Sequence, residues 1–295
     1  MKPPPFEYAV ARSVGDAVEL LNDGKHEEPR LLAGGQSLVP LLNMRFARPT
    51  LLVDLNRIPG LAAVDWNDGE VRIGAMARQR VLETDARIRE RIPLLTEAAG
   101  LIAHIAIRTR GTVGGSLAHA DPAAELPAAM CALEARFTIR GSDGTARTVP
   151  ASDFFRSPFT TAAGTGELVE AVEVRAPAAG TGWAFQETTR VHGAFALAGV
   201  AALVGIGGDG LINRSRLGLC GVGGAPYTPG WLDGLAVGQR PDPHLFEQIA
   251  GRVRDEIEPP SDGQASADHR RELAGVLTRR ALALAASRCA ATEAA

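Results

Sequence analysis

The chain has 295 residues, which is too long for one modest hydrophobic core, so we expect two or three domains. Hydrophobic residues make up 45% and charged residues 22%, which is ordinary for a soluble protein. The net charge of −3, without a strong Lys/Arg cluster, argues against nucleic-acid binding. No uncharged apolar run is long enough for a transmembrane helix, and the start MKPPPFEYAV is not typical of a signal peptide, so we expect a cytoplasmic protein.

The three cysteines, Cys131, Cys220 and Cys289, are isolated from one another and from histidines at metal-ligand spacing. A disulfide framework, a zinc site and a Cys-ligated iron–sulfur cluster are therefore not expected. We expect three small buried thiols.

The first part of the chain predicts a helix, two strands and a glycine loop between them. Ser13 and Asp16 have the spacing of a capping box, and an apolar stripe follows. Gly34 and Gly35 interrupt an apolar run. The expected elements are a helix from Ser13, a strand at 30–32, a short helix at 38–46 and a strand at 51–54.

The second part predicts a larger set of helices and strands, again with a Gly-Gly pair, Gly114-Gly115. Pro93 divides two helical patterns in 79–100, and Asp121-Pro122 is typical of the N-cap and first residue of a helix that continues to Leu133. The other expected elements are a strand at 71–75, a hairpin of 135–139 with 144–149, and a strand at 168–174.

The small, flexible segment 176–182 is the best domain boundary. Beyond it, Gly205 to Gly210 matches GxGxxG, but the chain continues as an alternating strand rather than a helix, which favours a hairpin turn over a dinucleotide fingerprint. The expected elements are strands at 183–189, 196–206 and 214–220 and helices at 229–237, 244–257 and 267–287.

The two Gly-Gly loops are the main functional signal, although an ordinary strand-to-helix turn can also contain such a pair. Adjacent glycines allow positive φ, so that successive backbone N–H groups can face an anion. Two such loops could hold a diphosphate between them without a metal ion. Arg108 and Arg110, which flank the second loop, could also face an anion.

His119, Asp121 and Glu125 lie close together in the sequence, but their pattern does not require a metal. Asp121 is accounted for as an N-cap, and Glu125 lies in a first helical turn, where the helix dipole favours a carboxylate. We therefore predict no metal site.

The combined pattern resembles the FAD-binding medium subunit of molybdenum hydroxylases, the flavoprotein subunit of the carbon monoxide dehydrogenase and xanthine dehydrogenase group. Residues 32–38 and 111–116 look like the paired FAD motifs of that family. Further matching segments are Leu42 to Pro49, Val53 to Pro59, Ala118 to Ala124, Gly221 to Gly223 and Arg270 to Leu273.

The resemblance implies an α+β fold. It consists of a two-lobed FAD-binding domain of the vanillyl-alcohol-oxidase (PCMH) type at 1–176, with lobes of about 1–57 and 58–176. A C-terminal α+β domain with a small antiparallel sheet follows at 183–288. The implied cofactor-binding residues are Leu32, Ala33, Gly34, Gly35, Gln36, Ser37, Leu38, Ile102, Gly111, Thr112, Val113, Gly114, Gly115, Ser116, Glu125, Val169, Glu170 and Gln186.

Several of these residues depart from the pattern of the family. Glu125 replaces an Asp near the adenosine ribose, Gln186 stands where relatives often have a Lys, and Ala194 stands in place of an Asp. Gln36 occupies a position where covalent flavin oxidases tend to carry His, which favours non-covalent FAD. A Cys-rich segment that holds an extra cluster in some relatives is missing.

The resemblance predicts an oxidoreductase component that is inactive on the organic substrate without its partners and has no catalytic residue acting on that substrate. Molybdopterin would lie on a large subunit and [2Fe–2S] clusters on a small subunit, in a dimer of heterotrimers. The FAD here would pass electrons to a quinone, NAD⁺, O₂ or another acceptor. The alternatives are a self-contained, non-covalent flavin oxidase and a scaffold without flavin; the second is disfavoured, because without a ligand nothing in the pattern requires paired exposed glycines.

Overall fold

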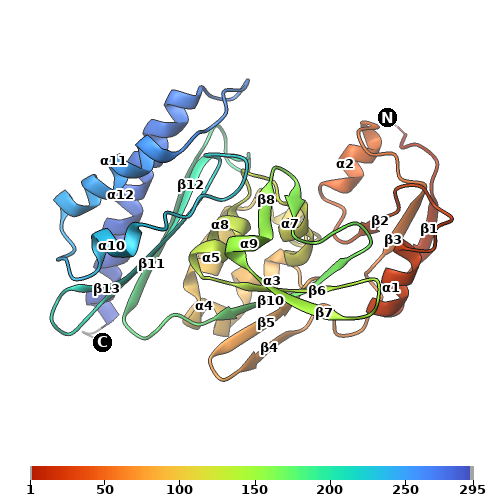
Figure 1. Cartoon of the computed structure of the whole chain (residues 1–295), viewed down its shortest axis with the longest axis horizontal. Coiled ribbons are helices and arrows are strands. Elements are labelled where there is room, and N and C mark those ends of the chain that lie inside the picture. The colour runs from red at the N-terminus through yellow and green to blue at the C-terminus, as the bar shows by residue number, and fades with distance from the viewer. Residues whose placement is uncertain (1, 293–295) are drawn as a thin grey trace.

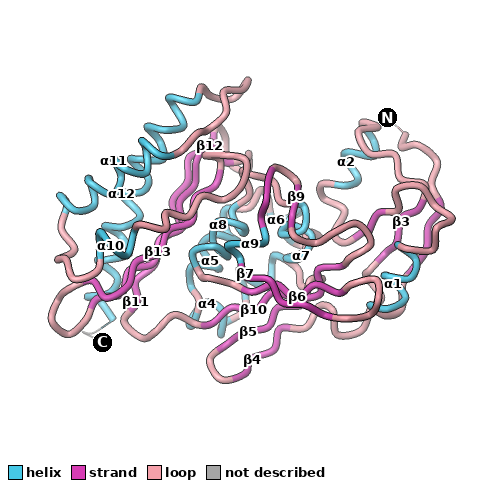
Figure 2. The backbone as a smooth tube through the Cα atoms, viewed as in Figure 1, coloured by secondary structure: helices cyan, strands magenta, loops and turns pink. Residues whose placement is uncertain are grey.

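The computed structural model describes residues 2–292, which form three parts in a row (Figure 1). An N-terminal lobe at the right and a larger middle lobe lie beside a C-terminal domain, whose long helices are at the left. The tube view shows that each part combines strands with helices (Figure 2). The fold is α+β, as expected.

The N-terminal lobe is built on a three-stranded parallel sheet in the order β1-β3-β2. Ser13 caps the first helix as predicted, with its hydroxyl accepting from the N–H of Asp16 at 3.0 Å. The elements are β1 (Glu7–Val10), α1 (Val14–Leu21), β2 (Arg30–Leu32), α2 (Leu38–Asn43) and β3 (Leu51–Asp54).

The middle lobe contains a five-stranded antiparallel sheet in the order β4-β5-β10-β6-β7, with most of its helices packed nearby. The strands of the lobe, of which β8 and β9 lie outside this sheet, are β4 (Val64–Asn67), β5 (Glu70–Gly74), β6 (Arg136–Arg140), β7 (Ala146–Pro150), β8 (Phe155–Ser157), β9 (Thr160–Thr161) and β10 (Leu168–Arg175). Its helices are α3 (Gln79–Thr84), α4 (Ala86–Arg91), α5 (Pro93–Leu101), α6 (Ile105–Arg108), α7 (Val113–His119), α8 (Glu125–Ala132) and α9 (Ala151–Phe154).

The C-terminal domain is a three-stranded antiparallel sheet covered on one face by its own helices. The turn between its second and third strands contains Gly207 and Gly210, so the GxGxxG segment is a hairpin turn as predicted. The elements are β11 (Thr181–Thr189), β12 (Ala196–Ile206), β13 (Ile212–Cys220), α10 (Leu232–Ala236), α11 (Pro243–Glu256) and α12 (Ala267–Thr292).

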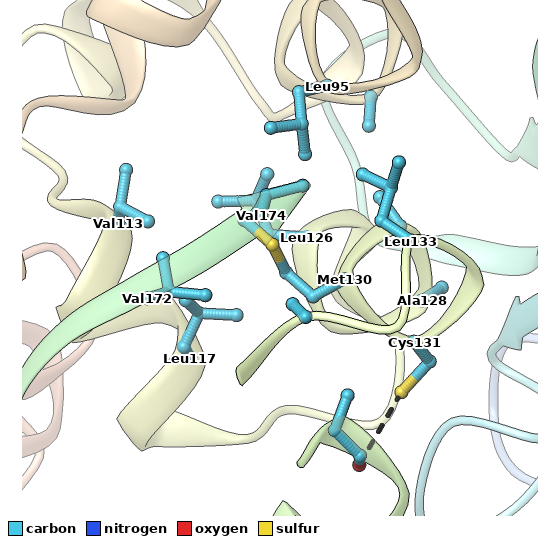
Figure 3. Close-up of a cluster of buried hydrophobic side chains, with 14 of the residues drawn as sticks. Leu95, Val113, Leu117, Leu126, Ala128, Met130, Cys131, Leu133, Val172 and Val174 are labelled. Carbon is cyan, nitrogen blue, oxygen red and sulfur yellow. Dashed lines mark hydrogen bonds between the residues drawn. The ribbon is translucent and has the colours of Figure 1, made fainter. Parts of the chain in front are cut away.

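One hydrophobic core joins the middle lobe to the C-terminal domain. Helix α8 packs against β12 and β13, and its buried side chains share a cluster with Phe185 of β11 and Cys220 of β13. Figure 3 shows Leu126 and Met130 of α8 close to Leu117 of α7 and the valines of β10. The start of α7 and the start of α8 are therefore held by the same core.

Several local features differ from the predictions. Strand β1 was not expected, because its short pattern becomes a strand only by pairing with β3. The segment 79–100 holds three helices rather than two, since Asp85 caps α4 by accepting from the N–H groups of Arg87 and Ile88. The short helix expected at 38–46 ends at Asn43, before Arg45, which has a φ of 62°.

Asp121 is not the N-cap of a helix, although the sequence predicted it. Its carboxylate accepts from the N–H of Ala123 at 2.9 Å in a turn, and α8 begins only at Glu125. A helix from Pro122 would place Pro127 in its interior, where the ring would clash and an N–H donor would be lacking. Starting at Glu125 places Pro127 in the first turn, where no N–H donor is needed.

Gly218 allows close contact between β13 and α8. A Cβ at this position would lie 2.1 Å from the carbonyl oxygen of Ala128. We expect Gly218→Ala to lower the free energy of unfolding by about 1–3 kcal/mol, because the helix must move away from the sheet. Urea denaturation checks this. The control is Gly251→Ala in α11, where nothing lies within 4 Å and stability should rise slightly. Equal stability of the Gly218 variant and the wild type would contradict the packing described.

Candidate functional site

Two glycine segments from different lobes lie in direct contact. We call residues 33–38 the first glycine segment and residues 111–116 the second. A Cβ on Gly34 would lie 2.3 Å from the carbonyl oxygen of Arg110 and 2.8 Å from the Cα of Gly111. A Cβ on Gly115 would lie 3.4 Å from the Cβ of Ala33. The fold therefore brings together the two segments that the sequence selected.

The first glycine segment presents a row of backbone N–H groups. Within residues 2–292, the N–H groups of positions 34–38 donate to no other protein group. Gly35 has a φ of 72°, a conformation that glycine adopts without strain. The Gln36 side chain donates to the Gly34 carbonyl at 2.9 Å, which fixes the turn. Successive N–H groups left free in a turn are a common way of binding a phosphate.

The second glycine segment differs from the expectation, because it is the start of α7 and its N–H groups are engaged. Val113 donates to Ala77 and Gly114 to Ala75, each at 2.8 Å, while Gly115 donates to the Thr112 hydroxyl at 3.1 Å. Gly111 and Ser116 also donate within the chain, to Ile107 and Thr112. In this segment the Thr112 N–H alone has no partner within residues 2–292. The segment acts mainly as a support for the first one.

The paired glycines are required by packing within the chain as well as by any ligand. Gly114 is buried, and a Cβ there would lie 2.4 Å from the Cβ of Ala75. Gly34 is buried against Arg110, as described above. Packing therefore requires Gly34 and Gly114 even without a ligand, contrary to what we predicted from the sequence. What indicates a ligand is the row of free N–H groups.

Two acids, Glu125, which is buried, and Glu187, which is half-buried, lie at the interface between α8 and the C-terminal sheet. Glu125 is 6% exposed, and burial, with smaller contributions from Glu187 and Asp121, raises the pKa of its carboxyl to about 8. Burial raises the pKa of Glu187 to about 7, and its Oε2 has no hydrogen-bond partner within residues 2–292. Such a carboxyl is suited to accept a hydrogen bond from a ligand hydroxyl.

Glu187, rather than Gln186, lies on the side of Glu125. Phe185 belongs to the core shared with α8, whereas Ala184 packs in the core with α12. Because side chains alternate along a strand, Gln186 lies on the α12 face opposite Val200, and its amide donates to its neighbour Phe185. The sequence did not select Glu187, since an isolated acid in a strand gives no signal without the sheet register.

The other residues that the sequence selected have different surroundings. Ile102 and Val169 are buried apolar residues, 8% and 7% exposed, while Glu170 is held by Arg72 and Arg140 and accepts from Ala75 through its carbonyl. The remaining positions that the sequence selected are Leu32, which ends β2 just before the first glycine segment, and Leu38, which is the last residue of that segment and the first of α2. Ala194 lies beside Gly193, whose Cα faces the ring of His104.

The two arginines near the second segment have different surroundings. Arg108 is buried and bonded to Glu83 and to the carbonyl of Ile102, so it does not face an anion. Arg110 is exposed. Within residues 2–292 no group of three or more His, Cys, Asp or Glu side chains could hold a metal ion, and no helix is long and apolar enough to cross a membrane.

Comparisons with known proteins identify the relatives of this fold. The family described as the FAD binding domain in molybdopterin dehydrogenase matches residues 4–177, and the CO dehydrogenase flavoprotein C-terminal domain matches residues 183–285. The carbon monoxide dehydrogenase medium chain of Hydrogenophaga pseudoflava is 37% identical over 98% of this chain and 100% of its own length. The chain belongs to the FAD-binding medium subunits of molybdenum hydroxylases.

Other relatives of this medium subunit also match it over nearly the whole length of both chains. The 6-hydroxypseudooxynicotine dehydrogenase complex subunit alpha of Paenarthrobacter nicotinovorans is 40% identical over 99% of this chain and 98% of its own length. A solved structure of carbon monoxide dehydrogenase from Hydrogenophaga pseudoflava has a TM-score of 0.94 at 38% identity, covering 98% of this chain and all of that one. The resemblance and the fold class inferred from the sequence are confirmed.

The residues of this medium subunit fit FAD as its cofactor. The free N–H groups of positions 34–38 suit the two negative charges of a diphosphate, which need no metal when several donors converge. The buried acceptor on Glu187 suits a hydroxyl of the cofactor. The predicted contacts of individual side chains with FAD stay predictions.

Proposed function

We propose that this chain is the electron-transfer subunit of a molybdenum hydroxylase, taking electrons from [2Fe–2S] clusters of a partner and passing them to an external acceptor. The observation that carries the proposal is the row of unpartnered N–H groups at 34–38 in a chain that matches FAD subunits over nearly its whole length. FAD, when bound, supplies the ability to collect two electrons and release them.

The residues of the chain would hold and orient the cofactor rather than react with an organic substrate. The first glycine segment would bind the diphosphate, with the second segment as its rigid support. Glu125, at the start of α8, and Glu187, on β11, would accept hydrogen bonds from hydroxyl groups. Neither acid needs to abstract a proton from a substrate, so the component would be inactive on that substrate alone.

The proposal includes a large molybdopterin subunit and a small [2Fe–2S] subunit as partners, assembled as a dimer of heterotrimers. It includes domain boundaries at 1–176 and 183–288. It also places the protein in the cytoplasm, where thiols remain reduced, in agreement with the buried thiols of Cys131 and Cys220, which form no disulfide within residues 2–292. Gln36, which bonds to the chain itself, agrees with non-covalent FAD.

Isolation of the native assembly tests the proposal. The chain, carrying an affinity tag, is purified from its own cells, and flavin, iron and molybdenum are measured across a size-exclusion peak. We expect all three to elute together in constant ratio. A flavin-containing chain that elutes alone, without iron or molybdenum, and oxidises an alcohol by itself would contradict the proposal and favour a self-contained oxidase.

A further inference from the structure

A chain of hydrogen bonds connects the two lobes next to the glycine segments. At its N-terminal end, the Tyr8 hydroxyl donates to Asp54, and the other carboxylate oxygen of Asp54 accepts from the Asn56 side-chain amide at 2.6 Å. The same amide donates to the Ala33 carbonyl at 3.1 Å. Asn56 therefore holds the residue that begins the first glycine segment.

Arg78 continues this chain into the middle lobe. Its Nη2 donates to the side-chain oxygen of Asn56 and its Nη1 to the carbonyl of Arg110, each at 2.6 Å. That carbonyl is the atom that faces Gly34, where a Cβ would lie 2.3 Å away. One oxygen atom is thus fixed by Arg78 and in turn limits how close the first glycine segment can approach.

The backbone around Arg78 also supports the second glycine segment. Arg78 forms an antiparallel bridge with Thr112, and the N–H of Gln79 donates to Gly111 at 2.9 Å. Arg78 is half-buried and Asn56 is exposed, so their hydrogen bond lies at the solvent-accessible edge of the contact between the lobes. The side chain of Asn56 therefore holds the first glycine segment, and the backbone at Arg78 holds the second.

We propose that Asn56 and Arg78 are positioning residues that fix the first glycine segment against the second and so set the affinity for the FAD diphosphate. The inference rests on FAD binding and not on the electron-transfer role. The free N–H groups belong to the N-terminal lobe, whereas their support belongs to the middle lobe. Without the bridge the two lobes can separate, and the N–H groups lose their fixed orientation towards a ligand.

The arginine acts here through geometry rather than through its charge. Both terminal nitrogens of Arg78 are used within the protein, one on each lobe. A lysine at this position would keep the charge, but its single ammonium group cannot reproduce the planar, two-directional donation. Charge and geometry therefore predict different results for the same substitution.

The test is a titration of FAD into the apo form of the full chain, with flavin fluorescence as the readout. We expect Asn56→Ala and Arg78→Gln each to raise the dissociation constant about tenfold, and the double variant to raise it no further than the worse single variant. Arg78→Lys should bind as weakly as Arg78→Gln. The loss should be the same at low and high KCl, because ionic screening does not affect geometry. The matched control is Arg57→Gln, an exposed neighbouring arginine outside the bridge, which should bind normally.

Several results would overturn the inference. Unchanged affinity in both single variants would do so, as would additive losses in the double variant. Recovery of binding by Arg78→Lys, or a loss that fades in high salt, would show that charge is the cause. Thermal unfolding of each apo-protein identifies variants that fail to fold. Because Asn56 and Arg78 are the two ends of one hydrogen bond, the FAD affinity of whichever single variant stays folded still tests the inference.

Discussion

Gly34→Ala is expected to abolish FAD retention during purification and to weaken FAD binding at least 100-fold. The added methyl group would lie 2.3 Å from the Arg110 carbonyl, so the first glycine segment must move away from the second. Hydrogen bonds to a charged group contribute about 1.5–3 kcal/mol each, so the loss of two or more of the N–H donors at 34–38 is enough for this effect. Equilibrium titration of the apo-protein with FAD measures it.

The matched control for this variant is Gly15→Ala in α1 of the same lobe. A Cβ there meets only the Ser13 hydroxyl at 3.8 Å, and φ is not positive, so FAD binding should be unchanged. Thermal unfolding of both apo-proteins shows whether the fold survives. A folded Gly34 variant that keeps its full flavin content would mean that the first glycine segment is not the diphosphate site.

The stability of the apo-protein is expected to fall as the pH rises from 5.5 to 8.5, and Glu125 is the main cause. Burial raises the pKa of Glu125 from 4.5 to about 8 in the folded protein. An acid with a raised folded pKa holds its proton more tightly when folded, so its contribution is most favourable below pH 4.5. That contribution is lost progressively up to about pH 8. Between pH 5.5 and 8.5 the free energy of unfolding should fall by about 3 kcal/mol because of this group.

Glu125→Gln should remove most of this pH dependence. Urea denaturation at pH 5.5, 7 and 8.5 compares the variant with the wild type, and the variant should gain relative stability as the pH rises. Glu187→Gln should act in the same direction over a lower range, because the pKa of Glu187 is raised to about 7. The groups that act electrostatically on Glu125 are Glu187 and Asp121, which raise its pKa, and Arg108, which lowers it. A difference between variant and wild type that stays constant with pH would contradict the buried, neutral carboxyl.

The sequence was sufficient for features whose cause is local. Ser13 caps a helix, Gly210 lies in a hairpin turn, and Gly34-Gly35 forms a turn whose N–H groups donate to no group within residues 2–292, because each feature depends on neighbours within a few residues. The family was recognisable from the combined motifs, and with it the cofactor. These predictions needed no knowledge of which elements pack together.

Features that depend on distant partners could not be predicted in this way. The N–H groups of Val113 and Gly114 are engaged by carbonyls from the segment 75–77, which no local pattern indicates. Glu187 becomes a candidate site residue only through the register of β11 with β12, and Arg78 only through its contact with the N-terminal lobe. In each case the deciding neighbour lies far away in the sequence.

Electron transfer from the reduced [2Fe–2S] partner subunit tests the central claim most directly, and it requires no knowledge of the organic substrate. The partner subunit is reduced chemically, freed of reductant and mixed anaerobically with this chain loaded with FAD. We expect the visible absorption of the oxidised flavin to be lost as the clusters are reoxidised, and the Gly34→Ala variant to show no such flavin signal. If the flavin stays oxidised beside reduced clusters in a formed complex, this chain is not their electron acceptor.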